Sequence, residues 1–196
     1  MPVLPNRRYP QWSPPGTALV GPLPEEPEAR REATVARLLE LARVALAVID
    51  ADAARDCLLP ASRIEISGDD FEYDTALCNA LRRGLLRVER LSDLDVQSAV
   101  WWPRPDKPGM ADLMLAGTEY TGQFSGWQKF PIAMPDAMRR AFDGEPGPVS
   151  SEDGRWSSVF VPLRDSLDDI VAVLELCVRH GGSSRKNGRP AAPECM

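Results

Sequence analysis

The chain has 196 residues, of which 43% are hydrophobic, and this composition predicts one folded domain of ordinary size. It carries 23 basic and 29 acidic residues, a net charge of −6, which argues against nucleic-acid binding because that function needs a basic face. No apolar run approaches the roughly 20 residues that span a bilayer, and no signal-peptide pattern opens the chain. We therefore expect a cytoplasmic protein without a membrane span, whose four scattered cysteines are reduced.

Proline density predicts the limits of the folded part. Eight of the 19 prolines lie within residues 1–27, where they remove backbone donors and favour extended conformations. This density predicts a disordered arm over residues 1–24. Residues 181–196 hold few large apolar side chains, so we expect a disordered tail there and a single domain over residues 25–180.

Two helices are expected in the first half of that domain. Residues 25–49 open with acidic side chains and then repeat apolar residues at steps of three and four, which predicts one long amphipathic helix. Its apolar stripe includes Leu38 and Leu46. An acidic run between Glu65 and Asp74 lacks the glycine and closing glutamate of a calcium loop, so we interpret it as the charged start of a second helix over residues 70–90.

After Ser92 the periodicity changes to that of strands. Residues 96–102 and 111–116 are expected to form one hairpin, and residues 155–162 and 170–179 a second, with a short helix over residues 135–142 that ends at Gly144. This order predicts an α+β fold, with an antiparallel sheet and its helices gathered on one face.

Period-two alternation assigns the side chains of the last strand. Ile170, Leu174 and Leu176 belong to its wholly apolar set, so we expect them on the face that the helices cover. Glu175 is then expected to point the other way, towards water or a second subunit.

Motifs for catalysis, phosphate binding or metal ligation are missing, and His180 is the only histidine. We therefore expect no catalytic residue, no metal site and no cofactor. The tryptophans allow two interpretations. Trp101 and Trp102 must point to opposite faces of their strand, so either the inner ring fills the core and the outer one packs under a helix or loop, or the tryptophans wall an aromatic pocket with Tyr120 and Trp127 on its lid. Trp156 belongs to the same group.

The last third of the chain resembles Cache-type, PAS-like sensor domains of bacterial signalling proteins. The resemblance covers about residues 131–176. It lies in a short helix with Met138, Arg139, Ala141, Phe142 and Gly144, in the turn Pro162-Leu163-Arg164-Asp165, and in the final strand segment Val171 to Glu175.

The resemblance implies a PAS/Cache-like sheet with a long N-terminal helix, and a small ligand held between the sheet and a layer of helix and loop. Binding would then shift the N-terminal helix and a dimer partner. This chain departs from the pattern, because it shows neither membrane segments nor an output domain. The aromatic, Arg and Asp signature of the amino-acid-binding members is not evident either, so the resemblance does not imply that this chain senses amino acids.

These observations favour a non-catalytic sensory domain that binds an unidentified small molecule and signals through a homodimer or a partner protein. The candidate ligand-binding residues are Trp101, Tyr120, Trp127, Arg139 and Trp156. Arg139 is expected either to pair with a ligand carboxylate or to lie on the exposed side of its helix. The alternatives are a ligand-free interaction or scaffold module that uses the 27–49 helix as its contact face, and an enzyme of unrecognised type.

Overall fold

A computed structural model describes residues 28–58, 63–67, 70–73, 75–117, 132–150 and 156–180. The arm expected over residues 1–24 and the tail expected over residues 181–196 lie outside the described residues. None of the helices within the described ranges is long and apolar enough to cross a membrane.

The long helix expected at the start of the domain is α1, Glu28–Val48. A further helix that the sequence analysis did not separate, α2, Ala51–Leu58, follows directly. Asp50 lies between them, and its side chain accepts a hydrogen bond of 3.2 Å from the backbone N–H of Ala53. Because this is the bond an N-cap residue makes to the third residue of its helix, Asp50 defines a new helix start.

The second long helix, α3, begins later than expected and spans Thr75–Leu91. Residues 70–73 are instead a strand, β2 (Asp70–Tyr73), which pairs antiparallel with β1 (Arg63–Ser67). The prediction of a helix from residue 70 was therefore wrong at its start. The segments RIEIS and DFEY alternate apolar and polar residues, and this period of two favours strands over a helical first turn.

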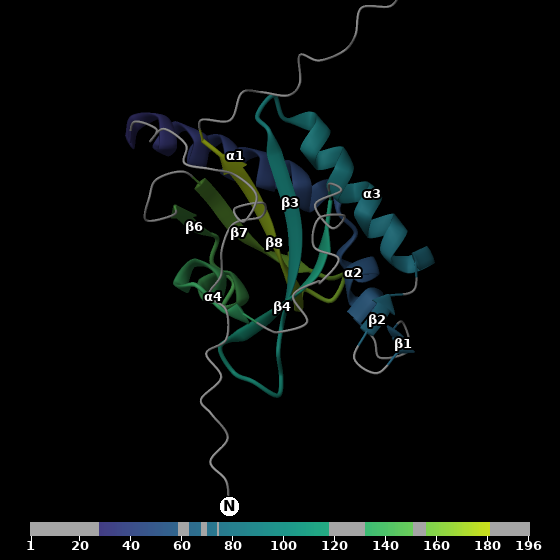
Figure 1. Ribbon diagram of the computed structural model, residues 1–196. Coiled ribbons are helices and arrows are strands. Elements are labelled where there is room, and N and C mark those ends of the chain that lie inside the picture. The colour runs from purple at the N-terminus through teal and green to yellow at the C-terminus, as the bar shows by residue number, and fades with distance from the viewer. Residues whose placement is uncertain are drawn as a thin grey trace, which may run out of the picture.

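The main sheet is antiparallel throughout its described strands, in the order β5-β4-β3-β8-β7-β6 (Figure 1). The four strands predicted from the sequence are confirmed as β3 (Val96–Pro103), β4 (Met110–Ala116), β7 (Trp156–Arg164) and β8 (Ile170–Arg179). The edge strands β5 (Ile132–Ala133) and β6 (Gly147–Ser150) were not predicted. Both strands are too short to show the alternation of apolar and polar residues that predicts a strand.

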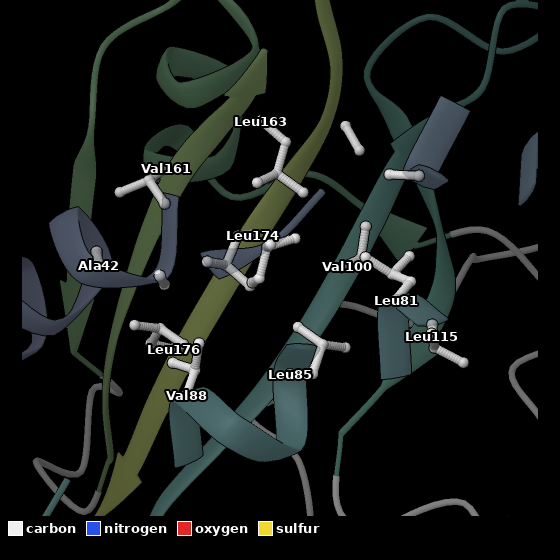
Figure 2. Close-up of a cluster of buried hydrophobic side chains, with 14 of the residues drawn as sticks. Ala42, Leu81, Leu85, Val88, Val100, Leu115, Val161, Leu163, Leu174 and Leu176 are labelled. Atoms are coloured by element: carbon white, nitrogen blue, oxygen red, sulfur yellow. The ribbon is translucent and has the colours of Figure 1, made fainter. Parts of the chain in front are cut away.

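One face of the sheet, here called the three-helix face, packs against α1, α2 and α3. Leu174 and Leu176 are fully buried there, which confirms their assignment to the helix-covered face. Figure 2 shows both side chains between those contributed by α1 and by α3. The buried apolar residues of this cluster that come from the helices are Leu38, Ala42, Ala45, Ala51, Ala54, Cys57, Cys78, Leu81, Leu85 and Val88.

The opposite face, here called the α4 face, packs against α4 (Asp136–Phe142). The expectation that all helices gather on one face was therefore wrong. The apolar residues of this second cluster include Ala99, Trp101, Ala137, Met138, Ala141, Phe160 and Val173. Because β7 and β8 are apolar at successive positions, both of their faces need cover, and a helix on one side alone leaves Phe160 and Val173 exposed.

Two glycines allow α4 to dock. Gly144 has φ of +97°, a left-handed conformation that suits the end of a helix and that side chains other than glycine rarely adopt. Gly147 of β6 faces the backbone of α4, and a Cβ at this position would stand only 2.5 Å from the carbonyl oxygen of Ala137. The backbones of α4 and β6 therefore lie so close at this point that no side chain fits between them.

Candidate functional site

The strand register places a group of polar side chains on the α4 face. In β8, Glu175 and Cys177 alternate with Leu174 and Leu176, so they point away from the three-helix face. Glu175 lies opposite Ala99 of β3 and Phe160 of β7. Cys177 lies opposite Gln97 of β3 and Ser158 of β7. The middle of this face is therefore polar, whereas its α4 end is apolar.

Glu175 is the central residue of this group and is completely buried, with 0% of its surface exposed. The indole N–H of Trp101 donates a hydrogen bond of 2.7 Å to its Oε2, and the hydroxyl of Ser158 donates one of 2.8 Å to its Oε1. Each carboxylate oxygen thus has a donor from a different neighbouring strand. The sequence analysis assigned Glu175 to the correct face, but its expectation of an exposed side chain was wrong.

The row next to Glu175 contains a thiol and an amide. Burial raises the pKa of the Cys177 thiol well above its ordinary value, the negative charge of Glu175 raises it further, and a hydrogen bond with Ser158 partly opposes both effects. Cys177 therefore stays a neutral thiol at physiological pH. The Oε1 atom of Gln97 is buried without a hydrogen-bond partner. A buried acceptor of this kind calls for an explanation, because most buried polar atoms in proteins are satisfied.

The five residues predicted to bind a ligand are placed differently by the structure. Trp101 and Trp156 are both buried, and the alternation of their strands puts both on the α4 face, with Glu175 and Ser158 between their positions. Arg139 lies on the outer side of α4, with 54% of its side chain exposed, and forms an ion pair with Asp136. Tyr120 and Trp127 lie outside the described residues.

Two further buried polar pairs lie on the three-helix face. The backbone N–H and the hydroxyl of Ser98 both donate to Oε1 of Glu89, at 2.9 and 2.7 Å, which ties β3 to α3. Ser157 and His180 are hydrogen-bonded through Oγ and Nε2 at 2.8 Å. Both are buried, with 0% and 4% of their surfaces exposed.

The sequence contains a signal that identifies Glu175. The segment Ile170–Arg179 reads IVAVLELCVR, which is nearly continuous in apolar residues, and a strand of this kind is covered on both faces. A single glutamate inside such a run is therefore expected to be buried and hydrogen-bonded. Trp101 lies diagonal to Glu175 in the pairing of β3 with β8, and the sequence alone does not reveal that these two strands pair.

Comparisons with known proteins add no assignment. No protein-family model matches the chain, and a search of curated proteins found no match. Among the described residues, no group of three or more His, Cys, Asp or Glu side chains is arranged to hold a metal ion. The α4 face offers the chemistry of its own side chains: a carboxylate with two donors, a neutral thiol and an amide.

Proposed function

We propose that this protein is a non-catalytic sensory domain that binds a small molecule on the α4 face of its sheet. The observation that carries the proposal is a polar group on an otherwise apolar surface, formed by the buried Glu175, Trp101 and Ser158 with the half-buried Gln97 beside them. Burying a carboxylate is costly, and replacing such a group by apolar residues is often neutral or stabilising. A function in recognition accounts for its presence better than stability does.

The position of the group supports the proposal further. The resemblance to Cache-type, PAS-like domains implies a ligand between the sheet and a layer of helix and loop. In this fold, α4 and residues 118–131, which contain Tyr120 and Trp127, both belong to the connection between β4 and β6. α4 packs on the face that carries Glu175, and α1 packs on the opposite face.

This arrangement offers a route for the signal. Leu174 and Leu176 flank Glu175 in β8 and pack on the other face, in the same cluster as Leu38 and Ala42 of α1. A ligand that shifts β8 at Glu175 therefore changes the packing of α1. Because close-packed cores do not deform smoothly, a small shift is passed on as a rearrangement.

A scaffold function is the second candidate, and one observation favours it. Val44, Leu46 and Val48 of α1 are exposed by 47%, 43% and 37%, which gives this helix apolar surface for a partner. The two functions differ in whether a small molecule binds to the α4 face.

Thermal unfolding of the full chain with a panel of small amines, carboxylates, sugars and nucleobases distinguishes them. A ligand at about 100 times its Kd stabilises a protein by about 2.7 kcal/mol, so a true ligand raises the Tm by several degrees. We expect Trp101→Phe to abolish this shift and Arg139→Ala to leave it unchanged. If no compound shifts the Tm and native mass spectrometry finds no co-purified molecule, the scaffold function replaces the sensory one.

A further inference from the structure

We infer that three arginines on α3, here called the arginine row, form a docking surface for an acidic helix of a partner protein. The row consists of Arg83, Arg87 and Arg90, which are all exposed and share one side of the helix because they are spaced by four and three residues. The helix lies at the periphery of the molecule, at the right of Figure 1. This surface is independent of the ligand proposed for the α4 face.

The charges of the arginine row are not balanced by acidic neighbours. α3 contains four arginines and a single acidic residue, Glu89. Glu89 points to the sheet, where it is 6% exposed and accepts two hydrogen bonds from Ser98. Within the described part of the chain, the side chains of Arg83, Arg87 and Arg90 are in no ion pair or hydrogen bond. The charges exposed on α3 therefore all have the same sign, in a chain whose net charge is −6.

Helix stability does not explain the row. Like charges spaced by three or four residues repel each other and lower the stability of a helix. Attraction to the negative end of the helix accounts for Arg90 in the last turn, but it falls off within that turn and does not reach Arg83. α1 shows a different arrangement, because Glu32 and Glu40 are interspersed among its exposed arginines. A partner of opposite charge accounts for a row that the fold itself leaves unbalanced.

The spacing of the row specifies the form of the partner. The row extends over about 10 Å of α3, because each residue adds about 1.5 Å along a helix. Carboxylates at intervals of three and four residues on a second helix have the same spacing, and each fits the planar donors of one guanidinium. Leu91 follows Arg87 by one turn and is 60% exposed, which adds an apolar contact beside the charges.

Two other anionic partners fit the molecule less well. Basic clusters that bind anionic lipids typically have about four to eight basic residues, and nucleic acid needs a larger basic face than one helix row. Membranes and nucleic acids are also extended negative surfaces, and the net negative charge of this chain opposes their approach. A single acidic helix contacts only the arginine row.

Peptide binding to the full chain tests the inference. The probe is a labelled helical peptide of alanine and leucine that carries three glutamates spaced by four and three residues, and two matched peptides carry glutamine or lysine instead. We expect the glutamate peptide to bind about tenfold more tightly than the glutamine peptide, as three exposed ion pairs imply, and the difference to shrink at high salt. Equal binding of the three peptides, or binding of none, would overturn the inference. Stronger binding to phosphatidylserine vesicles or to a DNA duplex would also overturn it.

Arg83→Glu separates recognition from a structural role. It turns the repulsion with Arg87 into attraction, so the Tm of the free protein should rise by about 1–3 °C. The affinity for the glutamate peptide should fall about fivefold, because one ion pair is lost and a repulsion is added.

Arg140→Glu is the matched control. Arg140 is an exposed arginine of α4, on the opposite side of the sheet, and its side chain forms no ion pair with any described residue. The control changes the net charge by the same amount and should leave the peptide affinity nearly unchanged. An equal loss of affinity in both variants would reduce the effect to net charge. A lower Tm of Arg83→Glu with unchanged peptide binding would show that the row is structural, and either result contradicts the inference.

Discussion

At the scale of single residues, Glu175 shows how strongly the neighbours of a side chain determine its environment. Glu175 lies between Ala99 and Phe160 on the α4 face. Its two carboxylate oxygens accept hydrogen bonds from the indole of Trp101 and the hydroxyl of Ser158. Removing one partner of a buried hydrogen bond costs more than the bond itself, because the other partner loses both water and protein contact. Glu175 is therefore a structural centre of this face whatever else it binds.

Glu175→Ala should lower the free energy of unfolding by about 2–6 kcal/mol, because it leaves both buried donors unsatisfied at about 1–3 kcal/mol each. This exceeds the cost of less than about 1 kcal/mol that an exposed position would imply. Urea unfolding at equilibrium measures the difference. Glu32→Ala, at an exposed position of α1, is the matched control and should stay within about 0.5 kcal/mol of the wild type. Equal effects of the two variants would contradict the burial of Glu175.

At the scale of elements, α1 presents a narrower apolar face to the sheet than its sequence indicates. Leu38, Ala42 and Ala45 are buried, and Ile49 just after the helix is buried too. Leu46, which shares the apolar spacing of this stripe, is 43% exposed. Among the described elements, β7, β8 and α3 pack most closely on α1, and Leu46 at the flank of the stripe stays in contact with water.

Leu38→Ala should therefore cost about 2–5 kcal/mol of stability, as expected for a fully buried leucine that leaves a cavity. Leu46→Ala removes the same atoms from an exposed position and should cost about 0.5 kcal/mol or less. Denaturant melts of the two variants, analysed with a common m-value, make this comparison. A loss at Leu46 as large as the loss at Leu38 would show that another surface covers α1, such as a second copy of the chain.

At the scale of the whole molecule, the main sheet is covered on both faces, by three helices on one side and by α4 on the other (Figure 1). The β7–β8 turn is attached to this body through α2, because Arg55 pairs with Asp165 and Asp52 accepts hydrogen bonds from Ser166. The large apolar side chains of α1 that stay exposed are Val44, Leu46 and Val48, near the end of the helix.

We predict a homodimer through this end of α1. Val44→Glu combined with Leu46→Glu should give a folded monomer, because both side chains are exposed and charges there disfavour an apolar contact. Leu38→Glu is unsuitable for this test, since Leu38 lies in the core and its replacement by a charge would unfold the chain. Sedimentation equilibrium of the wild type and the double variant measures the association, and a wild type that is monomeric at high concentration would refute the dimer.

By itself, the sequence determined the elements whose periodicity is long and regular. The final hairpin, the strands β3 and β4, the body of α1 and the short helix α4 follow from apolar spacing and from the proline and glycine at their ends. The two faces of β8 follow from alternation over its later residues, but the assignment of Ile170 to the three-helix face was wrong. Its Cδ1 lies 3.7 Å from where a Cβ on Gly144 would stand, at the end of α4, because a register shift between Leu163 and Arg164 interrupts the pairing there. These features are local, and local sterics act on them in the same way in every fold.

Only the tertiary structure decided which surfaces meet. The sequence analysis put α4 with the other helices and Glu175 in contact with water, because amphipathic spacing defines the faces of an element but not what covers them. The pairing of β3 with β8 brings Trp101 to Glu175 across 74 positions of sequence, and that pairing satisfies a carboxylate inside an apolar strand. The acceptor of Gln97 becomes buried for the same reason. Burial and hydrogen bonding are properties of neighbours in space, and the fold alone brings those neighbours together.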